Sequence, residues 1–124
     1  CCRYASASAI ARVAAAWPES LPPPLFSSFK TESLAAARDA AAAIARGYLL
    51  GRLGRSWQRD AAALGCVSVH CNQRHLDRAA AAAVRQAGYR LLAYTVNDAA
   101  RGRVLFDWGV DAVFTDYPDR LLAL

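Results

Sequence analysis

The sequence predicts an α/β fold with parallel strands, and two patterns carry this prediction. Short apolar runs alternate along the chain with longer, alanine-rich stretches of helical periodicity, so strands and helices follow one another repeatedly. The run at residues 91–96 is nearly continuous in apolar character, as expected for a parallel strand that is covered on both faces. With a helix between successive strands, the connections are expected to be right-handed crossovers.

Five strands are expected, each a short apolar run bounded by turn or cap residues. They lie at residues 24–29, 47–50, 66–70, 91–96 and 112–115. A helix at residues 5–16 precedes the first strand and lacks a strand of its own. Five strands cannot close a barrel, and an open sheet would leave two apolar edges exposed, so part of the fold is expected to be missing.

The helices between the strands carry start and stop signals. Thr31, Ser56 and Asn97 are each expected to cap a helix, because their side-chain oxygens can accept a backbone N–H bond. The helix at residues 76–87 is expected to stop at Gly88, where a left-handed conformation costs least. Helical spacing predicts these buried positions: Leu34, Ala37, Trp57, Ala61, Leu64, Val104, Leu105 and Trp108.

Composition excludes several classes of protein. Hydrophobic residues make up 56% and charged residues 20% of the 124 residues, which argues against a disordered chain. No 18-residue apolar run occurs, and Arg12 interrupts the one candidate for a signal peptide, so neither a membrane span nor a leader is expected. Four cysteines in a chain of this size do not make a disulfide scaffold, and two of them are its first two residues, so a reduced, cytoplasmic protein is expected.

The formal net charge of +5 is weak evidence for an anionic partner. No nucleic-acid-binding motif and no aromatic stacking platform accompanies the charge, so no nucleic-acid partner is expected. Arg52, Arg55 and Arg59 could bind a phosphate, but their spacing is also typical of the solvated face at a helix start.

Four residues, Cys66, His70, Cys71 and His75, have the ligand chemistry that suits zinc. In a strand, Cys66 and His70 would share a face but lie about 13 Å apart, at roughly 3.3 Å per residue. Cys71 would point to the opposite face. Zinc bonds of about 2.0 to 2.3 Å cannot span this distance, so no zinc site is expected.

Several short motifs lie along the chain in one order and spacing. They read LFSSF at 25–29, GYLL at 47–50, LGCVSVH at 64–70, AGYR at 87–90, YTVN at 94–97, WGVD at 108–111 and FTD at 114–116. In this order they resemble the C-terminal part of the glycerophosphodiester phosphodiesterase family, and most of all its cytoplasmic bacterial branch. The resemblance covers residues 11–124.

The resemblance implies a fold. The family forms a (β/α)₈ TIM barrel of the phospholipase-C-like phosphodiesterase type, and this chain would supply its last five βα units as an incomplete barrel. Residues 5–124 would form the partial barrel, and residues 1–4 an unmatched N-terminal junction. Active sites of such barrels lie at the C-terminal ends of the strands.

The resemblance also implies a function. The family hydrolyses glycerophosphodiesters to glycerol 3-phosphate and an alcohol, with a divalent metal (Mg²⁺ or Ca²⁺) and with histidines as acid and base. The family's His-Arg-Gly motif and acidic pair do not occur in this sequence, so no catalytic residue and no metal ligand is assigned. By motif match, the substrate-binding wall would comprise Ser27, Phe29, His70 and Tyr94.

The chain is therefore expected to be the C-terminal portion of a hydrolase of glycerophospholipid metabolism, inactive alone and holding no metal by itself. Its partner in the intact enzyme would be a small-molecule glycerophosphodiester. The alternative is a non-catalytic half-barrel that self-associates as a homodimer through its sheet edges and acts as a binding module.

The residues at the strand ends also have structural interpretations. Phe29 and Tyr94 could belong to the core, and Ser27 could stand beside a helix cap. Asn97 and Asp116 are interpreted as cap or turn residues rather than as catalytic groups.

Overall fold

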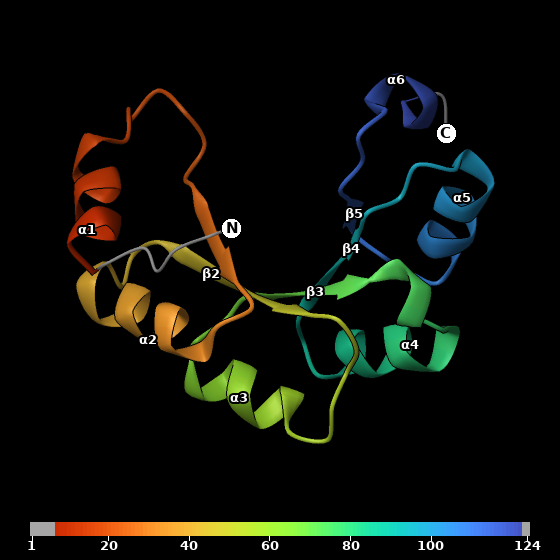
Figure 1. The fold of residues 1–124 in the computed structure, drawn as a ribbon, viewed down its shortest axis with the longest axis horizontal. Helices are drawn as coiled ribbons and strands as arrows, with labels where there is room; N and C mark the ends of the chain where they lie inside the picture. The colour runs from red at the N-terminus through yellow and green to blue at the C-terminus, as the bar shows by residue number, and fades with distance from the viewer. Residues whose placement is uncertain (1–6, 123–124) are drawn as a thin grey trace.

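Five parallel strands form one open, curved sheet in the computed structural model, which describes residues 7–122. The strands follow one another in chain order, and each pairs with the next (Figure 1). They are β1 (Leu25–Ser28), β2 (Ala45–Leu50), β3 (Ser68–Asn72), β4 (Arg90–Tyr94) and β5 (Ala112–Val113). The α/β class and all five predicted strands are thus confirmed, with bounds that shift by a few residues.

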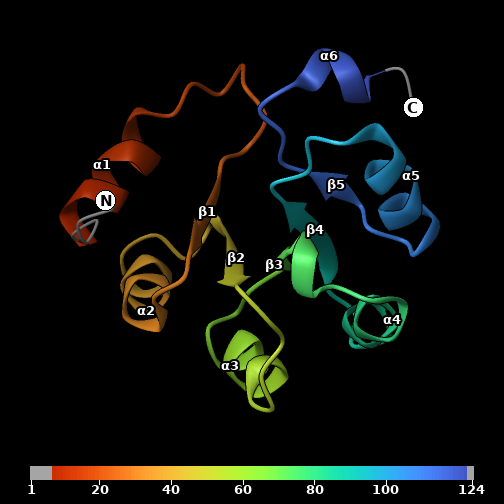
Figure 2. The same ribbon diagram turned by 45° about the vertical axis from the view of Figure 1, so that its right-hand side comes forward.

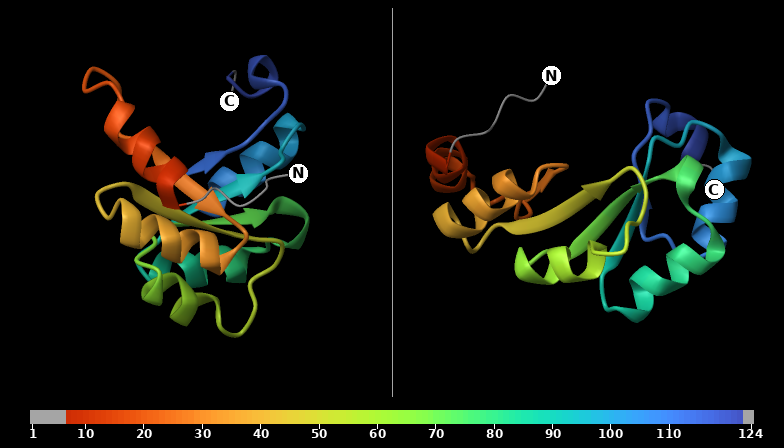
Figure 3. Two further views of the ribbon diagram at one scale, coloured as in Figure 1. Left: turned by 60° about the vertical axis from the view of Figure 1, so that its left-hand side comes forward. Right: turned by 60° about the horizontal axis from the view of Figure 1, so that its bottom comes forward.

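The helices lie along the outer side of the curved sheet, and together with the strands they form an arc (Figure 2). Figure 3 shows the same arrangement from two further sides. The helices are α1 (Ala7–Ala16), α2 (Thr31–Ala40), α3 (Trp57–Ala63), α4 (Arg78–Gln86), α5 (Ala99–Asp107) and α6 (Pro118–Leu121), with a 3₁₀ turn at Gln73–His75. Between residues 7 and 122, no helix is long and apolar enough to cross a membrane.

The core fills the space between the sheet and the helices, in two clusters. One surrounds β3 and β4 and includes Val69, Leu91 and Leu105, each fully buried; the other joins α2 and α3 to β2 around Leu34. Because side chains alternate along a strand, the residues between these core positions point to the opposite, inner face of the sheet. That inner face therefore carries the side chains that no helix covers.

Two of the predicted helix caps are wrong. Thr31 is the first residue of α2, and Lys30 holds the cap position. The cap of α5 is Asp98, whose carboxylate accepts a hydrogen bond from the backbone N–H of Arg101, whereas Asn97 lies outside the helix. Adjacent Asn and Asp residues are both good caps, so the sequence could not distinguish them.

Other helix predictions hold in part. Ser56 holds the cap position of α3, but its hydroxyl donates to the Asp60 carboxylate at 2.7 Å instead of capping the backbone. The helix α4 begins two residues later than predicted, after Asp77, and Gly88 adopts the expected left-handed conformation with φ of +87°.

Val104 is 38% exposed, so its predicted burial is wrong. Residues 1–6, including the predicted N-terminal junction, lie outside the described residues.

A buried arginine holds β2 to the segments on either side of it. The guanidinium of Arg46 donates to four backbone carbonyls: Ala42 and Ile44 before the strand, and Leu64 and Gly65 after α3, at 2.8 to 3.3 Å. Only 8% of Arg46 is exposed. The bonds to Ile44 and Leu64 are buried, and an unpaired buried carbonyl costs free energy.

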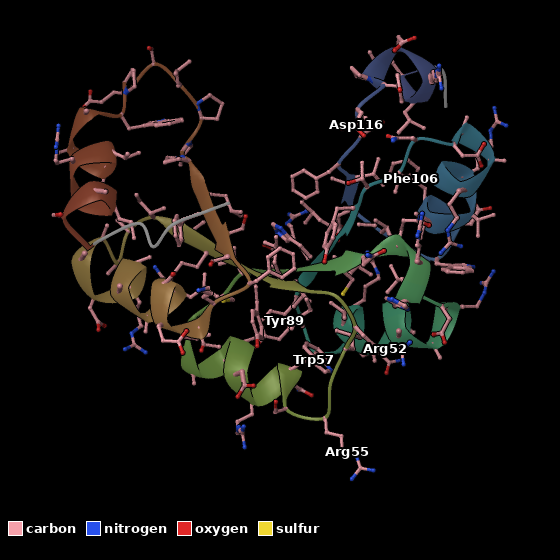
Figure 4. All side chains as sticks on the ribbon, viewed as in Figure 1. Arg52, Arg55, Trp57, Tyr89, Phe106 and Asp116 are labelled. Atoms are coloured by element: carbon pink, nitrogen blue, oxygen red, sulfur yellow. The ribbon has the colours of Figure 1, made fainter. Side chains whose placement is uncertain are left out.

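We expect Arg46→Met to lower the free energy of unfolding by about 2 to 4 kcal/mol, because it leaves several carbonyls unpaired while it keeps the apolar stem. Urea denaturation followed by circular dichroism measures this change. Arg55→Met is the matched control, since Arg55 is exposed and its side chain projects away from the fold (Figure 4). Equal unfolding midpoints for the two variants would contradict the role assigned to Arg46.

Candidate functional site

The inner face of the sheet brings together residues that are far apart in the sequence. Because the strands are parallel, their C-terminal ends meet at one edge, where active sites of βα barrels lie. All four residues of the predicted substrate wall belong to this face: Ser27 on β1, Phe29 directly after it, His70 on β3 and Tyr94 at the end of β4. Ser27 lies in register with Gly47 of β2, which in turn pairs with Ser68 of β3.

Tyr94 connects three strand ends. Its hydroxyl donates to the backbone carbonyl of Leu50 at the end of β2, at 2.9 Å. Its ring meets the ring of Phe29 edge to face, with centroids 5.9 Å apart. Phe29 is 58% exposed, so it forms an open apolar surface beside Tyr94 rather than part of the core. The two rings together offer an aromatic wall on the inner face.

His70 is fully buried beside this wall and packs where β2 lacks a side chain. A Cβ atom on Gly47 would lie 2.6 Å from Nε2 of His70, so only glycine leaves room for the imidazole. Nε2 lies 2.9 Å from Oγ of Ser68, and the ring of Phe114 packs against the imidazole with centroids 5.5 Å apart. Burial lowers the pKa of His70 to about 4, so the ring is neutral at pH 7.

Sequence reasoning missed three members of this arrangement: Gly47, Ser68 and Phe114. Gly47 carried a signal, because an isolated glycine within a strand often marks a close approach of another group. Ser68 and Phe114 lay in the family motifs, but only the fold shows that they surround His70.

Asn97 joins the ends of β4 and β5. Its amide nitrogen donates to the Asp116 carboxylate at 2.9 Å. Its amide oxygen accepts from the backbone N–H of Asp116 and from the hydroxyl of Thr115. The side chain that was predicted to cap a helix therefore fixes the loop after β5, and it holds Asp116, which lies at the upper end of the molecule in Figure 4.

The zinc-type residues lie on different sides of the sheet. Cys66 and Cys71 belong to the two separate core clusters under the helices, whereas His70 lies on the inner face. Burial raises the pKa of the Cys71 thiol to about 12, and it also raises that of Cys66. Within residues 7–122, no three His, Cys, Asp or Glu side chains gather closely enough to hold a metal ion.

The three arginines considered for phosphate binding have different surroundings. Arg52 contacts Nδ1 of His75 at 3.2 Å, and Arg59 forms an ion pair with Asp60 at 3.0 Å. Arg55 projects away from the fold (Figure 4). Among the described residues the three side chains have no common hydrogen-bond partner, which favours the solvated-face interpretation.

The fold and the position of the inner-face residues define a partial βα barrel, a class of protein whose active sites lie at the C-terminal ends of the strands. The sequence model of the glycerophosphoryl diester phosphodiesterase family matches residues 9–120. The chain belongs to this family. A comparison with curated proteins finds no match.

Solved structures of similar fold extend well beyond this chain. A phosphodiesterase from Oleispira antarctica, solved with the product sn-glycerol-3-phosphate, is 36% identical to this chain, with a TM-score of 0.89. The match covers 94% of this chain and 47% of the Oleispira antarctica chain. Glycerophosphodiester phosphodiesterases from Agrobacterium tumefaciens and Parabacteroides distasonis have TM-scores of 0.66 and 0.65 at 22% and 21% identity. The matched regions cover 81% and 78% of this chain, and 44% and 40% of the two solved chains. The chain thus spans less than half the length of each.

We expect Gly47→Ala to destabilise the fold by about 1 to 3 kcal/mol, because the added Cβ forces the buried imidazole of His70 to move. Chemical denaturation measures the loss. Gly54→Ala is the matched control, since a Cβ there meets nothing within 4 Å and is expected to be neutral or slightly stabilising. If both variants are equally stable, the absence of a side chain at position 47 is not what makes room for the His70 imidazole.

Stability is expected to depend on pH through His70. Its pKa is about 4 when folded against 6.5 when exposed, so between these values the unfolded chain binds a proton that the folded chain does not. The free energy of unfolding should therefore fall as the pH drops from about 6.5 towards 4. Urea titrations across this range should show a weaker pH dependence for His70→Gln than for the wild-type protein. Parallel curves for wild type and His70→Gln would refute this assignment.

Proposed function

We propose that this chain supplies the C-terminal half of a glycerophosphodiester phosphodiesterase barrel and, with it, the substrate-binding wall of the active site. The observation that carries this proposal is the family match over residues 9–120. The reaction is the hydrolysis of a glycerophosphodiester to glycerol 3-phosphate and an alcohol. The product-bound relative from Oleispira antarctica supports a small-molecule ligand of this kind.

The inner face suits one side of such a ligand. The rings of Phe29 and Tyr94 pack against the C–H groups of a glycerol or alcohol moiety and exclude water from it. Ser27 offers a hydroxyl in the same row of the sheet as Gly47. His70 stays neutral and offers a polar atom without adding charge. These residues bind and orient a ligand, and none of them is assigned a proton transfer.

The remaining half of the barrel supplies the rest of the chemistry. The family's metal neutralises charge on the phosphoryl oxygens when it is bound. The family's His-Arg-Gly motif and acidic pair do not occur in this sequence, so in this proposal the metal ligands and the acid–base histidines come from the rest of the barrel. This chain is then inactive alone. Cys66 and Cys71, the two cysteines among the described residues, are free thiols, which supports a reducing compartment such as the cytoplasm.

Self-association is the second candidate, and apolar grooves at the two ends of the sheet favour it. One groove of about 360 Å³ lies between α1 and β1 and includes Trp17 and Leu25; another of the same volume lies beside β5 and includes Phe106 and Leu122. These side chains are 38% to 86% exposed. Such surfaces would be covered either by the rest of the barrel or by a second copy of the chain.

Complementation tests the proposal directly. The part of the Oleispira antarctica phosphodiesterase that this chain does not match is co-expressed with it, and hydrolysis of glycerophosphocholine is measured with Mg²⁺ or Ca²⁺. We expect the two pieces to co-purify and to release glycerol 3-phosphate, while each piece alone is inactive. Tyr94→Ala in the reconstituted barrel is expected to raise KM several-fold, because it removes half of the aromatic wall.

Two outcomes would contradict the proposal. Turnover by this chain alone would show that its own residues are catalytic. A stable homodimer that does not bind the complementary piece would favour the binding module, and sedimentation equilibrium distinguishes this dimer from the mixed complex.

A further inference from the structure

The hydrogen-bond partners of His70 restrict which ring nitrogen carries its proton. Both polar groups involved are buried: His70 is 0% and Ser68 1% exposed. One bond joins them, between Oγ of Ser68 and Nε2 of His70 at 2.9 Å. Nδ1 of His70 is the one buried side-chain nitrogen or oxygen in the described part of the chain that has no hydrogen-bond partner.

The two neutral forms of the imidazole differ in how many polar groups they leave unpaired. If Nε2 carries the proton, it donates to Ser68, and then both the hydroxyl hydrogen of Ser68 and the lone pair of Nδ1 lack a partner. If Nδ1 carries the proton, Ser68 donates to Nε2, and only the Nδ1–H group is unpaired. Since each unpaired buried polar group costs about 1 to 3 kcal/mol, the Nδ1–H form is favoured.

We propose that Ser68 is a positioning residue that holds His70 as the neutral Nδ1–H tautomer, which makes His70 a hydrogen-bond donor to an oxygen acceptor on the inner face. Gly47 provides the space in which the ring takes this position.

The unpaired Nδ1–H group of His70 indicates which chemical groups a ligand would bring to it. An N–H donor pairs with a hydroxyl or phosphoryl oxygen, and glycerol phosphate carries both. The ring of Phe114 packs against the imidazole and is 46% exposed. Because little of its surface is buried, a rotation of this side chain would open a path for the ligand to His70 at little cost. The assignment of the ligand rests on the proposed function, whereas the assignment of the tautomer does not.

Nitrogen-15 NMR of the isolated chain tests the tautomer without any ligand. The sequence holds only two histidines, so His75→Gln leaves His70 as the sole imidazole. Long-range proton–nitrogen correlations at pH 7 should show a protonated Nδ1 and an unprotonated Nε2. A protonated Nε2 in this protein would overturn the proposal, whatever the variants show.

Variants at Ser68 separate positioning from packing. In the His75→Gln background, Ser68→Ala should shift His70 towards the Nε2–H form, and Ser68→Thr, which restores a hydroxyl, should keep Nδ1 protonated. An unchanged tautomer in Ser68→Ala would show that the hydroxyl does not set it. If Ser68→Ala fails to fold, the spectrum of the His75→Gln protein still shows which nitrogen of His70 carries the proton.

The ligand is tested separately in the reconstituted barrel. Addition of sn-glycerol 3-phosphate should move the Nδ1–H proton of His70 downfield as it gains an acceptor. Glycerophosphocholine hydrolysis without such a shift would refute His70 as a ligand donor while leaving the proposed function intact. Absence of both hydrolysis and shift, with the tautomer as proposed, would refute the function and not the role of Ser68.

Discussion

A side chain at position 47 would occupy the space of the His70 imidazole, with its Cβ only 2.6 Å from Nε2, so the arrangement of the inner face depends on this glycine. The parallel register makes the constraint possible, because it sets Gly47 beside Ser68 and the next inner residue of β2, Leu49, beside His70. With the ring seated over the glycine, Ser68 bonds its Nε2 and Phe114 covers it. One absent side chain thus makes room for a buried imidazole, which residues of β2 and β3 and Phe114, the residue after β5, surround.

The two faces of the sheet are built differently. The helix-facing side is apolar and closed, and its clusters hold the cysteines that resembled a metal site. The inner face combines exposed aromatic rings with a buried imidazole, and apolar grooves lie beside both edge strands, one between β1 and α1 and one between β5 and the helices α5 and α6. Exposed sheet edges of this kind are usually covered in proteins, and the similar phosphodiesterase from Oleispira antarctica is about twice as long as this chain.

The sequence predicted what depends on periodicity and missed what depends on tertiary contacts. Alternating apolar runs located all five strands, and Gly88 located the end of α4. The cap of α5 was misassigned because Asn97 and Asp98 suit that position equally, and only the contact of Asn97 with Asp116 decides between them. The burial of Arg46 leaves no sequence signal, since its partners are backbone carbonyls. Ser27, Phe29, His70 and Tyr94 share the expected face, while their role in binding is a proposal.

The measurement that tests the central claim most directly is a crystal structure of the reconstituted barrel with sn-glycerol 3-phosphate. The account predicts a closed barrel in which the ligand lies at the C-terminal ends of the strands, in contact with Phe29 and Tyr94 and with an oxygen near Nδ1 of His70. A ligand bound away from these residues, or a barrel in which this chain does not occupy the C-terminal half, would contradict it.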